Sequence, residues 1–202
     1  MAKLNPVVLA LISVIFSGCA SVKMPFFGNK PDPAETVTAS DEKLLVANEF
    51  VDKGRVVNRA RLQQRQNVLI FPFHAGVGVE ATDNLDKIAL MIIKGITDTF
   101  DSDQTGKHDH FHILTAESQE PAELILKGRF TEVAGPSTLK KWLPLTGRWS
   151  LGVSGKLMDA KSGEVLVIFT DKEATDDKND DTMKLGYQIG INIGQFLLSG
   201  VD

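Results

Sequence analysis

The chain has 202 residues, of which 43% are hydrophobic, and its formal net charge at pH 7 is −4. This length suits one globular domain with an extension, and the net negative charge argues against nucleic-acid binding as the main activity. Because the chain contains a single cysteine, an intramolecular disulfide is excluded and the domain depends on its hydrophobic core.

The N-terminus has the organisation of a secretory signal peptide. Lys3 precedes an apolar run, Val7–Phe16, which is too short to span a hydrocarbon core of ~30 Å as a helix. A positive start, a short apolar segment and small residues before the cleavage point are typical of signal peptides. We predict that residues 1–18 are removed by cleavage between Gly18 and Cys19, which makes the single cysteine the first residue of the mature chain.

The residues around the cut, Phe16-Ser17-Gly18-Cys19, resemble the bacterial lipobox, although Phe16 stands where that motif usually has Leu, Val or Ile. The resemblance implies a diacylglyceryl thioether on Cys19 and fatty acyl chains such as palmitate. Several lipid chains together anchor a protein firmly, whereas one chain does so only marginally. Ala20, in place of Asp, implies sorting to the outer membrane by the rule of enteric bacteria, with the domain facing the periplasm.

Two segments precede the expected domain. Residues 19–40 contain three prolines and many small residues, and we predict a lipidated N-terminus followed by a flexible linker. Residues 41–66 are predicted to be a helical and basic lead-in, in which Asp41 caps a helix from Glu42 to about Lys53. Four arginines between residues 55 and 65 indicate either a solvated helix face or loop, or a strip that binds an anion.

The globular domain is predicted to cover residues 67–202. Apolar and alternating runs predict strands at residues 68–73, 111–115, 122–134, 148–159 and 164–174. Helical periodicity predicts one helix from Thr82 or Asp83 to about Phe100, and another from about Met183 to Leu198 with Thr182 as a cap. Gly186, Gly190 and Gly194 recur every four residues, which favours close packing against another backbone or a sheet.

The order β-α-β-β-β-β-α predicts a two-layer α+β fold: a mixed, mainly antiparallel sheet of about five strands with two helices on one face. Residues 122–128 (AELILKG) and 159–166 (DAKSGEVL) resemble the uncharacterised envelope lipoproteins related to the curli-secretion lipoprotein and to the amino-terminal domain of TolB. The resemblance covers residues 67–198 and implies a strand, a D-x-x-x-G turn and a returning strand. Penicillin-binding-protein activator lipoproteins share this general fold, so the fold alone does not select a function.

Motifs for catalysis or cofactors are weak. No pattern of a nucleophile and a base is visible, and lipid occupies Cys19, so we predict no enzymatic activity. Gly76–Ala81 spells G-x-G-x-x-A, but the expected helix cap follows this motif, which favours a turn over a dinucleotide site. Asp101–Gly106 matches the first half of a calcium loop, yet position 12 is His112 instead of a bidentate Glu, which favours a polar loop.

His108, His110 and His112 are the most specific candidate for a metal site. Alternate residues of an extended chain share a face, so three imidazoles could converge on one ion. The alternative is an exposed loop that leads into a strand. No other cofactor is predicted.

The loop at residues 135–149 is the candidate surface for partner binding. It contains Trp142 and Trp149, flanked by Lys140, Lys141 and Arg148. Exposed aromatic rings with basic neighbours suit contact with a protein or a membrane interface, whereas the alternative is that both rings cover the edge of the core.

The sequence therefore predicts a non-enzymatic, lipid-anchored protein that binds or scaffolds envelope partners in secretion or surface assembly. A regulator of a peptidoglycan synthase and a metal-binding periplasmic protein are the alternatives. The oligomeric state is left open.

Overall fold

The computed structural model describes residues 43–81, 83–102, 110–115, 118–135, 149–177 and 181–201. The chain divides into two units, residues 1–30 and residues 31–202, and every described residue belongs to the second. The predictions for the signal peptide, for Gly18 and Cys19, and for the linker lie outside the described residues.

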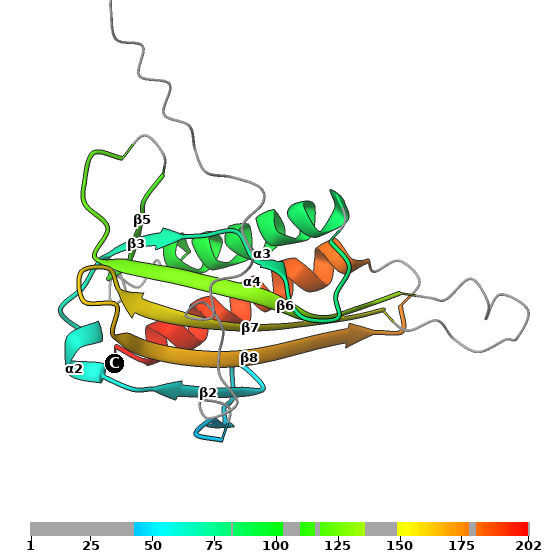
Figure 1. The fold of residues 1–202 in the computed structure, drawn as a ribbon, viewed down its shortest axis with the longest axis horizontal. Coiled ribbons are helices and arrows are strands. Elements are labelled where there is room, and N and C mark those ends of the chain that lie inside the picture. Colours follow the sequence, from blue (N-terminus) through cyan, green and yellow to red (C-terminus); the bar gives the residue numbers. More distant parts are fainter. Residues whose placement is uncertain are drawn as a thin grey trace, which may run out of the picture. The chain divides into compact units, whose positions relative to one another are not determined.

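The described residues form an eight-stranded sheet in the order β1-β2-β8-β7-β6-β3-β5, with β4 paired to β6 (Figure 1). Its centre consists of three antiparallel strands of 11 residues each: β6 (Leu124–Ala134), β7 (Trp149–Asp159) and β8 (Val165–Thr175). At one side lie the parallel-paired strands β3 (Asn67–Ile70), β4 (His74–Ala75) and β5 (His112–Ile113). At the other lie the antiparallel strands β1 (Val46–Ala47) and β2 (Lys53–Val56).

The predicted fold class is confirmed, although the sheet is larger than the five strands expected. The two long helices, α3 (Asp83–Asp101) and α4 (Thr182–Ser199), lie on the same side of the sheet (Figure 1). Asp181 caps α4, one residue before the predicted cap, because its carboxylate accepts hydrogen bonds from the backbone N–H groups of Met183 and Lys184. No helix in the described ranges combines the length and the hydropathy needed to cross a membrane.

The helix predicted from Glu42 to Lys53 is wrong. The described residues of this segment form β1, a turn and the start of β2, and the first helix after them is the short α2 (Arg59–Leu62). In β2, Gly54 faces the core, where an added Cβ would lie 2.3 Å from the ring of Phe196. Both residues of β1 are exposed, whereas Val51, which lies between β1 and β2, is buried in the core.

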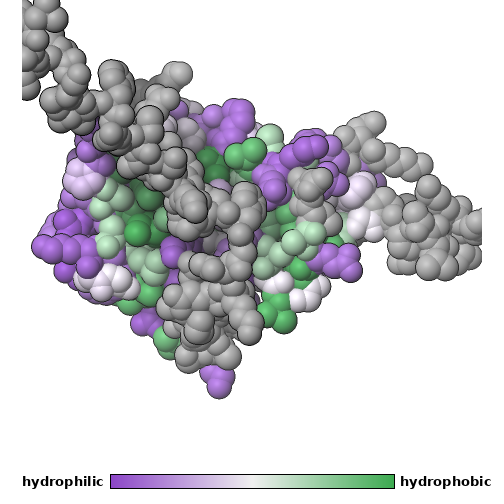
Figure 2. Space-filling view, turned by 45° about the horizontal axis from the view of Figure 1, so that its top comes forward, coloured by the Kyte–Doolittle hydropathy of each residue, from purple (hydrophilic) through white to green (hydrophobic). Residues whose placement is uncertain are grey.

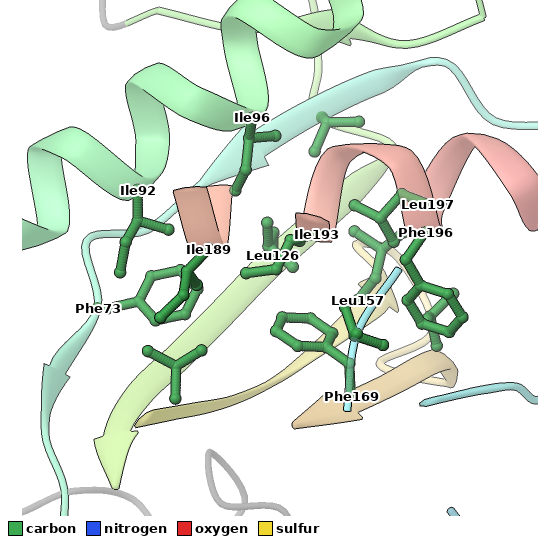
Figure 3. Packing of buried hydrophobic residues seen from close by; sticks show 14 of the residues in the cluster. Phe73, Ile92, Ile96, Leu126, Leu157, Phe169, Ile189, Ile193, Phe196 and Leu197 are labelled. Carbon is green, nitrogen blue, oxygen red and sulfur yellow. The ribbon is translucent and has the colours of Figure 1, made fainter. Parts of the chain in front are cut away.

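The core lies between the sheet and the helices, and Figure 3 shows its centre. Isoleucines and leucines of α3 and α4 meet the inward side chains of β6, β7 and β8, among them Leu126, Leu157 and Phe169, which are fully buried. Complete burial of a side chain of this size contributes roughly 1.5–3 kcal/mol, so this layer is the main source of stability.

Glycines allow α3 and α4 to pack with their backbones in contact. A Cβ added at Gly190 would lie 2.2 Å from the carbonyl oxygen of Ile92, and one added at Gly95 would lie 2.3 Å from that of Tyr187. The close packing predicted from the glycine repeat is therefore present, and its partner is α3.

Candidate functional site

The face of the sheet opposite α3 and α4 is the candidate site. No described helix covers this face, which we call the outer face (Figure 1). Residues that are directly paired across antiparallel strands project to the same side, so the register shows which side chains reach it. The row of Gly128, Gly155, Phe169 and Gly54 points to the core, and the rows on either side of it point outward.

The two outward rows are rich in cations. One row consists of Lys127, Lys156, Ile168 and Arg55. The next consists of Arg129, Ser154, Thr170 and Lys53. A third row adds Lys172, which is directly paired with Gly152 on β7. We call the six cations of these rows the basic face: Lys53, Arg55, Lys127, Arg129, Lys156 and Lys172.

Glu132 is the one carboxylate at an outward position of β2, β6, β7 and β8, strands that the structure describes completely. It accepts hydrogen bonds from Lys172 Nζ at 2.6 Å and from Ser150 Oγ at 2.5 Å, and these bonds lower its pKa. The outer face is thus strongly positive, although the whole chain has a net charge of −4. Because the charges are distributed unevenly, the outer face has a positive local potential on a chain whose net charge is negative.

Several of these cations are held in position. The Nε atom of Arg129 donates to Ser154 Oγ at 3.1 Å, and Lys127 Nζ lies 5.3 Å from the centroid of the Phe71 ring. Lys156 is largely buried. A preorganised array of cations loses less side-chain entropy when an anion binds than mobile lysines would.

Exposed apolar side chains do not mark a competing site. In the described ranges, the exposed apolar side chains include Val46 on β1, Val77 in the turn before α3 and Leu90 on α3. These three residues lie on separate elements. Figure 2 shows apolar residues interspersed with hydrophilic ones on the visible side. Charge, and not an apolar patch, is therefore the distinguishing property of the outer face.

The arginines of the lead-in have a structural role at the D-x-x-x-G turn. Asp159, which is 1% exposed, accepts hydrogen bonds from the backbone N–H of Ser162 at 2.7 Å and from Arg65 Nε at 3.2 Å. The backbone bond from Ser162, together with Arg61 and Arg65, lowers the pKa of Asp159 to about 2. Arg61 and Arg65 therefore bind carboxylates of their own chain, which is neither of the two roles expected from the sequence.

A second buried carboxylate lies where α4, β8 and the turn before β2 meet. Asp171, which is 4% exposed, accepts hydrogen bonds from Asn192 Nδ2 at 3.0 Å and from the backbone N–H of Asp52 at 3.2 Å. Burial raises its pKa to about 6, and the nearby carboxylates of Glu173 and Asp52 act in the same direction.

The predicted partner loop lies almost entirely outside the described residues, which include only Trp149 of its five candidate side chains. Trp149 is half-buried and packs against the core, and a Cβ added at Gly135 would lie 2.6 Å from its ring. For Trp149 this contact favours the alternative that the ring covers the edge of the core. Lys140, Lys141, Trp142 and Arg148 stay a prediction.

The predicted metal ligands are described in part. His110 Nε2 lies 3.4 Å from the carbonyl oxygen of Leu62, and its ring packs edge-on against Phe111. His112 is exposed on β5, and His108 lies outside the described residues. The side chains that the structure describes contain no group of three or more metal-binding residues. The three-histidine site stays a prediction.

The glycine motif before α3 forms a turn. The backbone N–H of Gly76 donates to the carbonyl oxygen of Phe130 at 3.0 Å, and Gly78 has a φ of 82°, which favours glycine. Because α3 begins at Asp83, the motif precedes the helix and does not form its N-terminal turn. Most of the segment that resembles a calcium loop lies outside the described residues.

The sequence reading missed the basic face. The indication in the sequence is that Lys53 and Arg55, and likewise Lys127 and Arg129, are two residues apart and so project to the same side of a strand. These pairs lie on strands that are distant in sequence, so only the register shows that they share one surface.

No protein-family model and no curated protein matches the chain. Among solved structures, it is similar to the PelC dodecamer from Paraburkholderia phytofirmans, with 13% identity and a TM-score of 0.45 over 72% of this chain and 91% of that chain. It is similar to lipoprotein GNA1162 from Neisseria meningitidis, with 10% identity and a TM-score of 0.36 over 65% and 97%. It is also similar to protein XCC0632 from Xanthomonas campestris, with 11% identity and a TM-score of 0.41 over 68% and 81%.

Proposed function

We propose that this protein is a non-enzymatic, lipid-anchored module of the cell envelope that binds an acidic partner on its basic face. The observation that carries the proposal is the register of β2, β6, β7 and β8, which gathers six cations and one carboxylate on the face opposite the helices. An acidic partner is complementary to such a surface, because opposite potentials accelerate the encounter of two proteins. Repulsion between like charges disfavours basic partners.

The lipid anchor is the second part of the proposal. Cleavage before Cys19 and its lipidation would hold the domain at the outer membrane, facing the periplasm, within reach of its linker. A tethered binding surface acts at a high local concentration, so a modest affinity is sufficient for function. An accessory role in secretion or surface assembly requires binding of this kind and no catalytic group.

The loop at residues 135–149 is a second contact in this proposal. Its basic residues, Lys140, Lys141 and Arg148, have the same sign of charge as the basic face. The charge of both surfaces would therefore attract an acidic partner.

Photo-crosslinking in the native envelope tests this function. A photoreactive amino acid at Thr170, in the middle of the outer face, is expected to capture an acidic protein or an anionic polymer. The variant Lys53→Gln, Arg55→Gln and Lys172→Gln removes three exposed cations of the basic face. The control variant Arg59→Gln, Lys87→Gln and Lys161→Gln removes three exposed cations elsewhere.

We expect the crosslinked product to disappear in the first variant and to persist in the control. If the product persists equally in both, the basic face is not the binding surface, and the proposed function is wrong.

A further inference from the structure

The buried carboxylate of Asp171 connects the helix layer to the turn between β1 and β2. We call this turn, residues 48–52, the entry turn, because it joins the first two strands of the sheet. Asp171 Oδ1 accepts a hydrogen bond from the backbone N–H of Asp52 in the entry turn at 3.2 Å. Asp171 Oδ2 accepts one from Asn192 Nδ2 on α4 at 3.0 Å. A change of charge at Asp171 is therefore felt by both elements.

The charged side chains that act on Asp171 in the described part of the chain are both carboxylates. They are Glu173, two residues along β8, and Asp52 in the entry turn. The side chain that α4 contributes, Asn192, is neutral, and the residue paired with Asp171 on β7 is the apolar Val153. Asp171 is 4% exposed, so on ionisation its charge is kept from water and lies near two like charges. The contacts that favour its ionised form are two hydrogen bonds from neutral donors.

The nearest cations in sequence project to the other face of the sheet. Lys172 on β8 and Lys53 on β2 occupy outward positions, whereas Asp171 shares the inward side of β8 with Phe169. Lys172 Nζ is paired with Glu132 at 2.6 Å. These two lysines therefore do not neutralise Asp171.

The entry turn is the part of the cover over Asp171 that opens most easily. It connects strands of two and four residues at the edge of the sheet, and β2 is the strand through which both pair with β8. The helix α4 has 18 residues and is in backbone contact with α3. Short edge elements open more readily than packed helices and central strands. Opening of the turn withdraws the Asp52 N–H, takes the buried Val51 out of the core and lets water reach Asp171.

We propose that the entry turn is a pH-sensitive cover of Asp171, which is held closed more firmly at acidic than at neutral pH. In the closed turn, protonation removes a buried charge and its repulsion from two neighbouring carboxylates. In the open turn, water stabilises the ionised carboxylate. Lys53 follows Asp52 directly, so the same equilibrium determines how firmly one cation of the basic face is held. The proposal does not depend on the nature of the partner that binds this face.

Proton linkage gives the direction and size of the effect. The pKa of Asp171 is about 6 when the turn is closed, and hydration in the open turn returns it towards 3.8. Because the closed form has the higher pKa, it binds the proton more tightly, and a fall in pH favours closing. The equilibrium constant for opening is expected to be about tenfold larger at pH 7 than at pH 5.

Hydrogen exchange of single amides tests the proposal. It is measured by NMR on the mature lipidated protein in detergent at pH 5 and pH 7, and it is corrected for the intrinsic effect of pH on exchange. The amide of Asp52 reports directly, because its N–H donates to Asp171. We expect its protection factor to be lower than that of Val153 on the central strand β7, and to fall about tenfold from pH 5 to pH 7.

Two results would overturn the proposal. Equal protection of Asp52 and Val153 would show that the turn opens only when the whole domain unfolds. A protection factor of Asp52 that is the same at both pH values would show that opening does not depend on a buried carboxylate.

Variants assign the effect to Asp171. Asp171→Asn removes the titrating group and keeps an oxygen that can accept from the Asp52 N–H, so we expect the same protection at both pH values. Asp86→Asn, at an exposed position of α3, should keep the tenfold change. A tenfold change that persists in Asp171→Asn would show that another group is responsible.

Glu173→Gln keeps the test decisive if Asp171→Asn does not fold. It removes one of the charges that repel Asp171, so the change in the protection of Asp52 between pH 5 and pH 7 should become smaller than in the wild type. An unchanged tenfold effect would contradict the proposed repulsion among these carboxylates.

Discussion

At the scale of single residues, two buried carboxylates make stability depend on pH in opposite directions. The pKa of Asp171 is raised from 3.8 to about 6, so its ionised form destabilises the folded state above pH 6. This penalty is relieved as the pH falls from about 6 towards 4. The pKa of Asp159 is lowered to about 2, so its stabilising effect is lost only as the pH falls below 3.8.

The variant Asp171→Asn tests the first of these effects. A shift of about two units corresponds to as much as ~3 kcal/mol over the whole interval from pH 6 to pH 4. The free energy of unfolding of the wild type should therefore rise by about 1.4 kcal/mol between pH 7 and pH 5. In Asp171→Asn we expect this rise to be absent. Urea unfolding at each pH measures it, with Asp86→Asn, an exposed position on α3, as the control. An equal rise in Asp171→Asn would show that another group is responsible.

The variant Asp159→Ala tests the turn. It leaves the backbone N–H groups of Lys161 and Ser162 without their acceptor, and it removes one of the two carboxylates that pair with Arg65. We expect a loss of about 2–3 kcal/mol in the free energy of unfolding at pH 7. Lys161→Ala, in the same turn but exposed, should change it by less than about 0.5 kcal/mol. Similar stabilities of the two variants would contradict the role given to Asp159.

At the scale of elements, the contact between α3 and α4 gives a sharp prediction. Gly190→Ala would place a methyl group 2.2 Å from the carbonyl oxygen of Ile92, which is backbone and cannot move aside. We expect a loss of at least ~2 kcal/mol in the free energy of unfolding. A Cβ added at Gly186 would lie 3.0 Å from Cγ2 and 3.2 Å from the carbonyl oxygen of Ile88. This overlap is much smaller than the one at Gly190, and the helix-propensity gain of about 1 kcal/mol for Gly186→Ala offsets part of it. Equal urea midpoints for the two variants would show that the helices are not in backbone contact.

Long elements could be predicted from the sequence because each has a periodic apolar face of its own. The helices α3 and α4 and the strands β6 to β8 show this periodicity over many residues. The strands β1 and β4 have two residues each, too few for any period, and β2 is stabilised by pairing with the distant β8. Thr182 and Asp181 both have a side-chain oxygen that could cap α4. Asp181 is the cap because its backbone is extended, as is typical of the residue that precedes the first helical turn.

The candidate site was less predictable than the fold. Its six cations come from four strands and appear ordinary in sequence, where alternating lysines and arginines usually mark a solvated strand face. Their common surface depends on the pairing of β6, β7, β8 and β2, which no local pattern encodes.

At the scale of the whole molecule, the predicted anchor can be tested through its single cysteine. Cys19→Ser removes the one thiol of the chain and with it the attachment point for diacylglycerol. We expect the variant to incorporate no radiolabelled palmitate and to leave the membrane fraction. Lys3→Ala is the control, because it changes the leader but leaves the cysteine intact. Palmitate labelling of Cys19→Ser at the wild-type level would contradict a lipid anchor at this residue.

The central claim is that the basic face binds an acidic partner. Its most direct test is the affinity of the mature lipidated protein, in detergent, for fluorescent poly-glutamate, measured by anisotropy at low and high salt. We expect salt-sensitive binding that is about tenfold weaker in the Lys53→Gln, Arg55→Gln, Lys172→Gln variant, at about 0.5 kcal/mol per charge, and unchanged in the Arg59→Gln, Lys87→Gln, Lys161→Gln control. Equal affinities of these two variants, or binding that salt does not weaken, would contradict the claim.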